Sequence, residues 1–109
     1  TQLEILHQIQ PDRIELYTYD YSHHYHENKA AAILPYCHVV DWLTTHTAIG
    51  INAGHDLNLD NLSYLLQTIP AIQEVSIGHQ FVCDCLDFGL EETMSRYLEL
   101  LPNPLPKTA

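Results

Sequence analysis

The chain has 109 residues and a mass of 12.5 kDa, and its 46% hydrophobic and 17% charged residues indicate one folded globular domain. Four basic against 14 acidic residues give a formal charge of −10 at pH 7, which excludes a basic face for nucleic acid or an acidic membrane surface. No apolar run approaches the roughly 18 residues of a membrane span, and the first residues do not resemble a signal segment. We therefore expect a cytoplasmic protein.

The cysteines support the same expectation. Cys37, Cys83 and Cys85 are odd in number and too few for a secreted disulfide framework. One residue separates Cys83 from Cys85, whereas zinc sites commonly use a spacing of two or more. We expect no metal at this pair.

The first half of the chain predicts a helix end, a strand and a long helix. Apolar residues near position 5 suggest the end of a helix. Residues 13–18 alternate between polar and apolar, which predicts a strand. Residues 26–46 carry apolar side chains at helical intervals but contain Pro35, which predicts a kinked or restarted helix.

The second half predicts two more strands, each followed by a helix. Residues 48–52 and 74–77 are strand-like. Between them, leucines at helical spacing over 59–69 predict a helix with Asn58 or Asp60 as its cap. Residues 90–101 predict a last helix that Pro102 stops. We expect residues 102–109 to be a flexible tail.

Strands that alternate with helices predict an α/β fold with a parallel sheet. The side-chain parity of the strands predicts one apolar and one polar face, because alternate residues point to opposite sides. A polar second face favours a barrel interior over a doubly wound sheet. The expected apolar face contains Ile14, Leu16, Ile49, Ile51, Val75 and Ile77, and the polar face contains Arg13, Glu15, Asn52, Glu74 and Ser76.

Two strands are followed by a Gly-His dipeptide, Gly54-His55 and Gly78-His79. In parallel α/β folds, ligands bind at the carboxyl ends of the strands, next to helix amino termini. Glycine lets backbone N–H groups approach an anion closely. These loops predict a phosphate or oxyanion site, although tight turns would use the same residues.

The ordered set of motifs resembles the pyridoxine 5′-phosphate synthase family. The resemblance runs from about residue 2 to 101 and is strongest at residues 13–18 (RIELYT), 52–58 (NAGHDLN), 74–79 (EVSIGH) and 89–91 (GLE). It implies a TIM barrel, of which residues 1–101 would form the carboxyl-terminal part with strands six to eight. It also implies the condensation of 3-amino-2-oxopropyl phosphate with 1-deoxy-D-xylulose 5-phosphate to pyridoxine 5′-phosphate, phosphate and water. Neither a metal nor an organic cofactor is implied.

The resemblance also implies roles for five residues. His55 matches the family's proton donor and Glu15 its transition-state stabiliser, while Asp56, Gly78 and His79 match positions that contact the aminoketone phosphate, mostly through backbone. A histidine and a carboxylate suit a ring closure that needs repeated proton transfers. The alternative for Glu15 is a structural carboxylate paired with Arg13 or a neighbouring strand.

The chain departs from the family pattern in two respects. Tyr19 stands where the family usually has glycine, so we expect the loop 18–24 to be reshaped. A closed barrel usually needs about 250 residues, and three strands alone would leave two unpaired edges. We therefore expect a fragment that is inactive alone and is completed by a missing amino-terminal half. Members of the family typically form homo-oligomers.

Two other classes of protein stay open. His23, His24 and His26, with His38 nearby, would suit a small module that binds zinc or nickel, or simply a solvated surface loop. A non-catalytic half barrel that binds a partner barrel is the other alternative.

Overall fold

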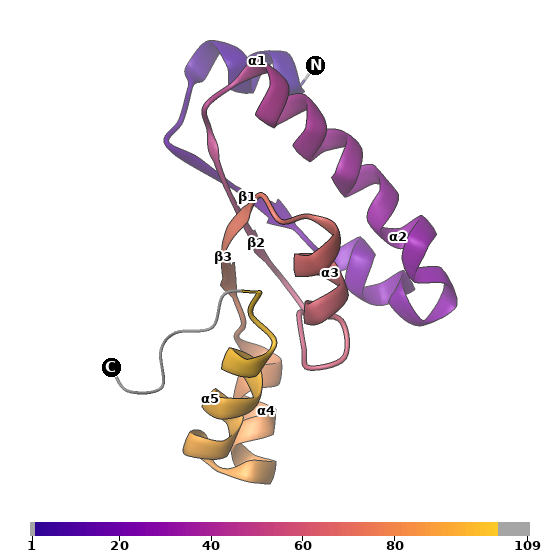
Figure 1. Cartoon of the computed structure of the whole chain (residues 1–109), viewed down its shortest axis with the longest axis vertical. Coiled ribbons are helices and arrows are strands. Elements are labelled where there is room, and N and C mark those ends of the chain that lie inside the picture. The colour runs from indigo at the N-terminus through magenta and orange to yellow at the C-terminus, as the bar shows by residue number, and fades with distance from the viewer. Residues whose placement is uncertain (1, 103–109) are drawn as a thin grey trace.

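The computed structural model describes residues 2–102, which form three strands and five helices (Figure 1). In chain order these elements are α1 (Gln2–Ile9), β1 (Arg13–Tyr17), α2 (Tyr19–His46), β2 (Gly50–Gly54), α3 (Leu62–Thr68), β3 (Ile72–Ser76), α4 (His79–Phe88) and α5 (Leu90–Glu99). The predicted alternation of strands and helices is confirmed. None of the helices in this part of the chain has the length and apolar character of a membrane span.

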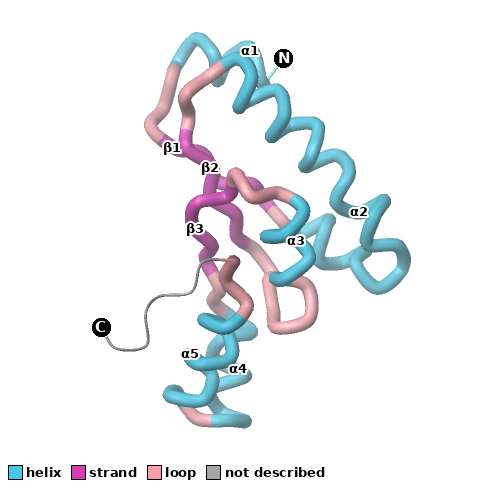
Figure 2. Tube along the Cα trace, viewed as in Figure 1, coloured by secondary structure: helices cyan, strands magenta, loops and turns pink. Residues whose placement is uncertain are grey.

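The strands form one parallel sheet in the order β1-β2-β3 (Figure 2). β2 is central and hydrogen-bonds to both neighbours, so Glu15, Asn52 and Glu74 lie in one row across the sheet. The predicted α/β class with a parallel sheet is confirmed. The three strands are consistent with part of a TIM barrel.

One face of the sheet is buried, as the alternation predicts. Leu16, Ile51 and Ala53 have almost no exposed surface and pack in a core with side chains of α2 and α3. Figure 1 shows α2 and α3 on the same side of the sheet. Burial of apolar surface contributes about 25 cal/mol of free energy per Å² and drives this packing. The apolar face therefore determines which side of the sheet the helices cover.

The opposite face of the sheet is polar. Arg13 Nη1 donates to Asn52 Oδ1 at 3.0 Å, and Asn52 Nδ2 donates to Glu74 Oε2 at 3.2 Å. Arg13 also forms an ion pair with Glu74 at 3.6 Å. Arg13 therefore contacts Asn52 and Glu74 across the strands, and the polar second face that the sequence predicted is confirmed.

The long helix differs from the prediction in where it begins and breaks. α2 starts at Tyr19, so most of the expected loop over 18–24 is helical. The residue of α2 with non-helical backbone angles is Asn28, with φ −162° and ψ 94°, and not Pro35. Asn28 Oδ1 accepts a hydrogen bond from the backbone N–H of Ala31 at 3.1 Å. This is the geometry of an N-cap, so Asn28 restarts the helix.

The other elements shift by a few residues. α3 is shorter than predicted, because Asn58 Oδ1 accepts from the N–H groups of Asp60 and Asn61 and holds a turn ahead of the helix. The region after β3 contains two helices, separated at Gly89, which has φ 86°. Glycine favours this left-handed conformation. The predicted tail at 103–109 lies outside the described residues.

Candidate functional site

An open pocket of about 730 Å³ lies at the carboxyl ends of the three strands. Its lining comes from β1, from the loop that follows β2 and from the amino end of α4. The pocket brings together all five residues that the resemblance singled out, Glu15, His55, Asp56, Gly78 and His79. Their convergence follows from parallel pairing, which brings the carboxyl ends of neighbouring strands to one edge.

Gly54, the last residue of β2, makes room for the carboxylate of Glu15. A Cβ atom at position 54 would collide with Glu15 Oε1 and lie 3.2 Å from the Cβ of Ser76. The Glu15 side chain therefore extends across β2, next to the residue that precedes His55. By contrast, a Cβ at Gly78 would meet nothing within 4 Å, so the described chain sets no steric requirement for glycine there.

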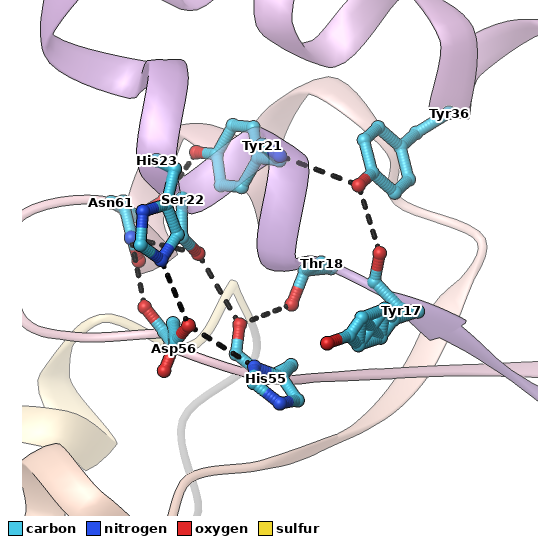
Figure 3. A network of polar contacts seen from close by, with 9 residues as sticks. All are labelled: Tyr17, Thr18, Tyr21, Ser22, His23, Tyr36, His55, Asp56 and Asn61. Carbon is cyan, nitrogen blue, oxygen red and sulfur yellow. Dashed lines mark hydrogen bonds and ion pairs between the residues drawn. The ribbon is translucent and has the colours of Figure 1, made fainter.

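The backbone of His55 and Asp56 adopts a conformation that is rare outside glycine. Their φ angles are 121° and 56°, in the positive region that costs non-glycine residues free energy. The carbonyl oxygen of His55 accepts hydrogen bonds from Thr18 Oγ1 at 2.7 Å and Ser22 Oγ at 3.3 Å (Figure 3). Side chains from the start of α2 therefore hold the loop after β2 in place.

Buried Asn61 supports the same loop from the other side. Asn61 Nδ2 donates to the carbonyl oxygen of Asp56 at 3.3 Å, and its Oδ1 accepts from the N–H of Asn58 at 2.9 Å. Tyr21 Oη donates to the carbonyl oxygen of Asn61 at 2.5 Å. Burial raises the pKa of the Tyr21 phenol above its ordinary value, so this hydroxyl stays a donor at neutral pH.

The carboxylate of Asp56 contacts two imidazole rings. Asp56 Oδ2 lies 3.2 Å from His23 Nε2 and 3.1 Å from His55 Nδ1 (Figure 3). Burial opposes ionisation, but the hydrogen bonds and positive charge of the two histidines outweigh it and lower the pKa of the Asp56 carboxyl. Asp56 is therefore ionised at neutral pH.

Aromatic rings surround these histidines. The ring of Tyr19 stacks on His23 with centroids 3.9 Å apart, and the ring of Tyr17 meets the edge of His55 at 4.5 Å. Tyr19 also raises the question of backbone strain. Within residues 2–102, the non-glycine residues with positive φ are Gln10, His55 and Asp56. Tyr19 is not among them, so it carries no such backbone strain in the first turn of α2.

The three clustered histidines do not converge on one point. His23 contacts Asp56, His24 Nδ1 lies 2.9 Å from Glu27 Oε2, and His26 packs against the ring of Tyr25. Within residues 2–102, no group of three or more potential metal ligands gathers. The cluster lies on a helix, not on the surface loop that the sequence suggested.

Sequence reasoning missed three supports of the site, Thr18, His23 and Asn61. Thr18 and Asn61 are buried polar residues. Thr18 Oγ1 donates to the carbonyl oxygen of His55, 37 positions away, and Asn61 Nδ2 donates to Ser22 Oγ, 39 positions away. Such contacts leave no local pattern. His23 follows Tyr19 by four residues, a spacing that predicts a contact only when the helix is known to begin at Tyr19.

Comparison with known proteins identifies the family. The family model described as "Pyridoxal phosphate biosynthesis protein PdxJ" matches residues 1–103. The chain belongs to the PdxJ family. The resemblance of the motifs to pyridoxine 5′-phosphate synthases is thereby confirmed.

Two curated relatives support the same family assignment. The chain is 52% identical over 91 residues to the pyridoxine 5′-phosphate synthase of Porphyromonas gingivalis, and 50% identical over 90 residues to that of Cytophaga hutchinsonii. Each alignment covers 83% of this chain but 37% of the relative. The chain therefore spans little more than a third of the length of these curated PdxJ relatives.

Proposed function

We propose that the chain supplies the His55 side of the active site of a pyridoxine 5′-phosphate synthase, a transferase of vitamin B6 and pyridoxal phosphate biosynthesis. The reaction would be the condensation of 3-amino-2-oxopropyl phosphate with 1-deoxy-D-xylulose 5-phosphate. The observation that carries the proposal is the convergence of Glu15, His55 and Gly78 at one pocket in a chain of the PdxJ family.

The pocket offers a group for each part of this chemistry. His55 would donate a proton to the leaving oxygen, and the carboxylate of Glu15, which reaches across Gly54, would stabilise positive charge on the condensing amine. The substrate phosphate would lie against backbone N–H groups at Asp56, Gly78 and His79, where the ten-residue helix α4 begins. Backbone binding suits a chain with only four basic residues.

The same proposal includes a structural complement for the sheet. Within residues 2–102, the outer edges of β1 and β3 have no strand partner, and the polar face carries Arg13, Glu15 and Glu74 exposed. Unpaired edges and an open inner face suit strands six to eight of a barrel. The remaining strands would bring the general bases and the second substrate's site, in a cytoplasmic homo-oligomer.

The test is reconstitution of the barrel. The chain is co-expressed with the amino-terminal part of the Porphyromonas gingivalis relative, and pyridoxine 5′-phosphate is measured by chromatography after adding both substrates. We expect product from the assembly and none from the chain alone. His55→Asn should lower the rate by about 10²-fold to 10⁴-fold, and the matched His38→Asn, on an exposed position of α2, should not.

Other outcomes decide between the alternatives. An assembly that forms without product would favour the non-catalytic half barrel. Turnover of both substrates by the purified chain alone would contradict the need for a complement. A His55→Asn assembly with the full rate would remove His55 from the reaction.

A further inference from the structure

One carboxylate oxygen of Asp56 is shared by two imidazole rings at the pocket. We propose that Asp56 is a positioning residue that fixes His55 as its Nδ1–H tautomer and His23 as its Nε2–H tautomer. The inference rests on the proposed function for what His55 does with substrate. The tautomers themselves are a property of the folded chain and can be measured without substrate.

The tautomers follow from the atoms in contact. His55 faces Asp56 Oδ2 with Nδ1 at 3.1 Å, whereas His23 faces the same oxygen with Nε2 at 3.2 Å. An ionised carboxylate only accepts hydrogen bonds, so each facing nitrogen must carry a proton. A neutral imidazole has one N–H. Neutral His55 therefore keeps its lone pair on Nε2, and neutral His23 keeps its lone pair on Nδ1.

The local backbone and the neighbouring rings hold this arrangement. The positive φ angles of His55 and Asp56 are maintained by hydrogen bonds to both carbonyl oxygens, from Thr18 and Asn61 among others. Tyr19 lies one helical turn before His23 and stacks on its ring at 3.9 Å. The His23 ring is thus held between an aromatic face and the Asp56 carboxylate.

A fixed tautomer gives His55 a defined chemical role. With Nδ1–H bound to Asp56, the nitrogen that accepts a proton and returns it to a substrate is Nε2. When His55 is doubly protonated, the carboxylate at Nδ1 stabilises the imidazolium without itself taking the proton, as in other carboxylate–histidine pairs. His23 adds a second imidazole to the lining of the same pocket.

The direct test is NMR of the intact chain with 15N-labelled histidines. Two-bond 1H–15N spectra, recorded at a pH where the spectra themselves show each ring to be neutral, distinguish protonated from unprotonated ring nitrogens. We expect unprotonated Nε2 at His55 and unprotonated Nδ1 at His23. A His55 ring that carries its proton on Nε2 would overturn the proposal.

Variants show whether Asp56 is the cause. Asp56→Ala should lower the Nδ1–H to Nε2–H ratio of His55 about fivefold, the equivalent of about 1 kcal/mol for one hydrogen bond. Asp60→Ala makes the same change at an exposed aspartate nearby and should leave the ratio unchanged. His24, which contacts Glu27 instead, is an internal control whose signals should not move. An unchanged ratio in folded Asp56→Ala would refute the proposal.

A further variant keeps the test valid if Asp56→Ala does not fold. His23→Asn leaves the carboxylate in place, so His55 should remain the Nδ1–H tautomer, and a switch to Nε2–H would contradict control by Asp56. Failure of the synthase proposal would leave these tautomers as they are. Wrong tautomers would overturn this inference and leave the assigned reaction untouched.

Discussion

The side chain of Asn61 makes three hydrogen bonds around the loop after β2. Its side chain is 1% exposed and bonds to the backbone of Asp56 and Asn58 and to the hydroxyl of Ser22. Asn61→Ala leaves partly buried polar groups unpaired, so we expect the free energy of unfolding to fall by about 1–3 kcal/mol. Urea denaturation measures it. Gln67→Ala, which removes an exposed contact to Ser63, should cost no more than about 0.5 kcal/mol.

The lowered pKa of the Asp56 carboxyl predicts that the stability of the chain changes with pH. Its pKa is lowered from the ordinary 3.8, so its stabilising effect is complete above that value and is lost as the pH falls through the lower folded pKa. Asp56→Asn, which tolerates positive φ, should therefore be less stable than wild type at pH 6, and the difference should shrink as the pH falls below 3.8. The pair is more than one-third exposed, with Asp56 at 37%, so we expect a difference within about 1 kcal/mol. A constant difference across the range would contradict the ionised contact.

At the scale of the elements, Asn28 determines where α2 restarts. Its side chain caps the N–H of Ala31, and loss of an N-cap costs about 0.5–2 kcal/mol. Asn28→Ala should destabilise the chain by that amount in thermal or urea unfolding. Asn28→Ser keeps a capping oxygen and should retain most of the stability. Equal stability of the two variants would show that the break does not depend on the cap.

The hairpin of α4 and α5 contains a second buried polar contact. Tyr97 Oη donates to Asp84 Oδ2 at 2.6 Å, whereas the buried Thr93 hydroxyl has no partner within residues 2–102. Tyr97→Phe leaves the carboxylate short of a donor, so we expect a loss of about 1–3 kcal/mol in unfolding free energy. Thr93→Val removes an unpaired hydroxyl and should be neutral or stabilising. A stabilising Tyr97→Phe would contradict this account.

The sequence was sufficient for some elements and not for others, for physical reasons. Strand faces such as Ile14 and Leu16 against Arg13 and Glu15 were predictable because period-two alternation directly reflects which side is buried. The start of α2 at Tyr19 was missed because polar and histidine-rich residues there give no apolar stripe. The pocket was predictable because parallel pairing alone brings the ends of β2 and β3 together. The contact of Asn61 with Ser22 joins residues 39 positions apart, so no local pattern predicts it.

At the scale of the whole molecule, the chain is broad and thin. Its extents are 44 × 37 × 20 Å and its radius of gyration is 15.0 Å, larger than the roughly 13 Å of a compact 100-residue domain. A sheet covered by helices on one face accounts for the thin dimension. This shape is consistent with part of a barrel wall.

Hydrogen exchange can test the proposed completion of the sheet by further strands. β2 has a strand on both sides, whereas β1 and β3 each have one outer edge without a strand among residues 2–102. The amides on the outer edges of β1 and β3 should therefore exchange faster than those of β2. When the amino-terminal part of the Porphyromonas gingivalis relative is added, the edge amides of β1 and β3 should gain protection by about tenfold or more, since each is withdrawn from water into a ladder. The amides of β2 should change little, because they are already paired, and α4 amides that face no strand serve as a further reference. Protection that rises evenly over all elements would indicate general stabilisation, and protection confined to one edge would contradict closure of a barrel.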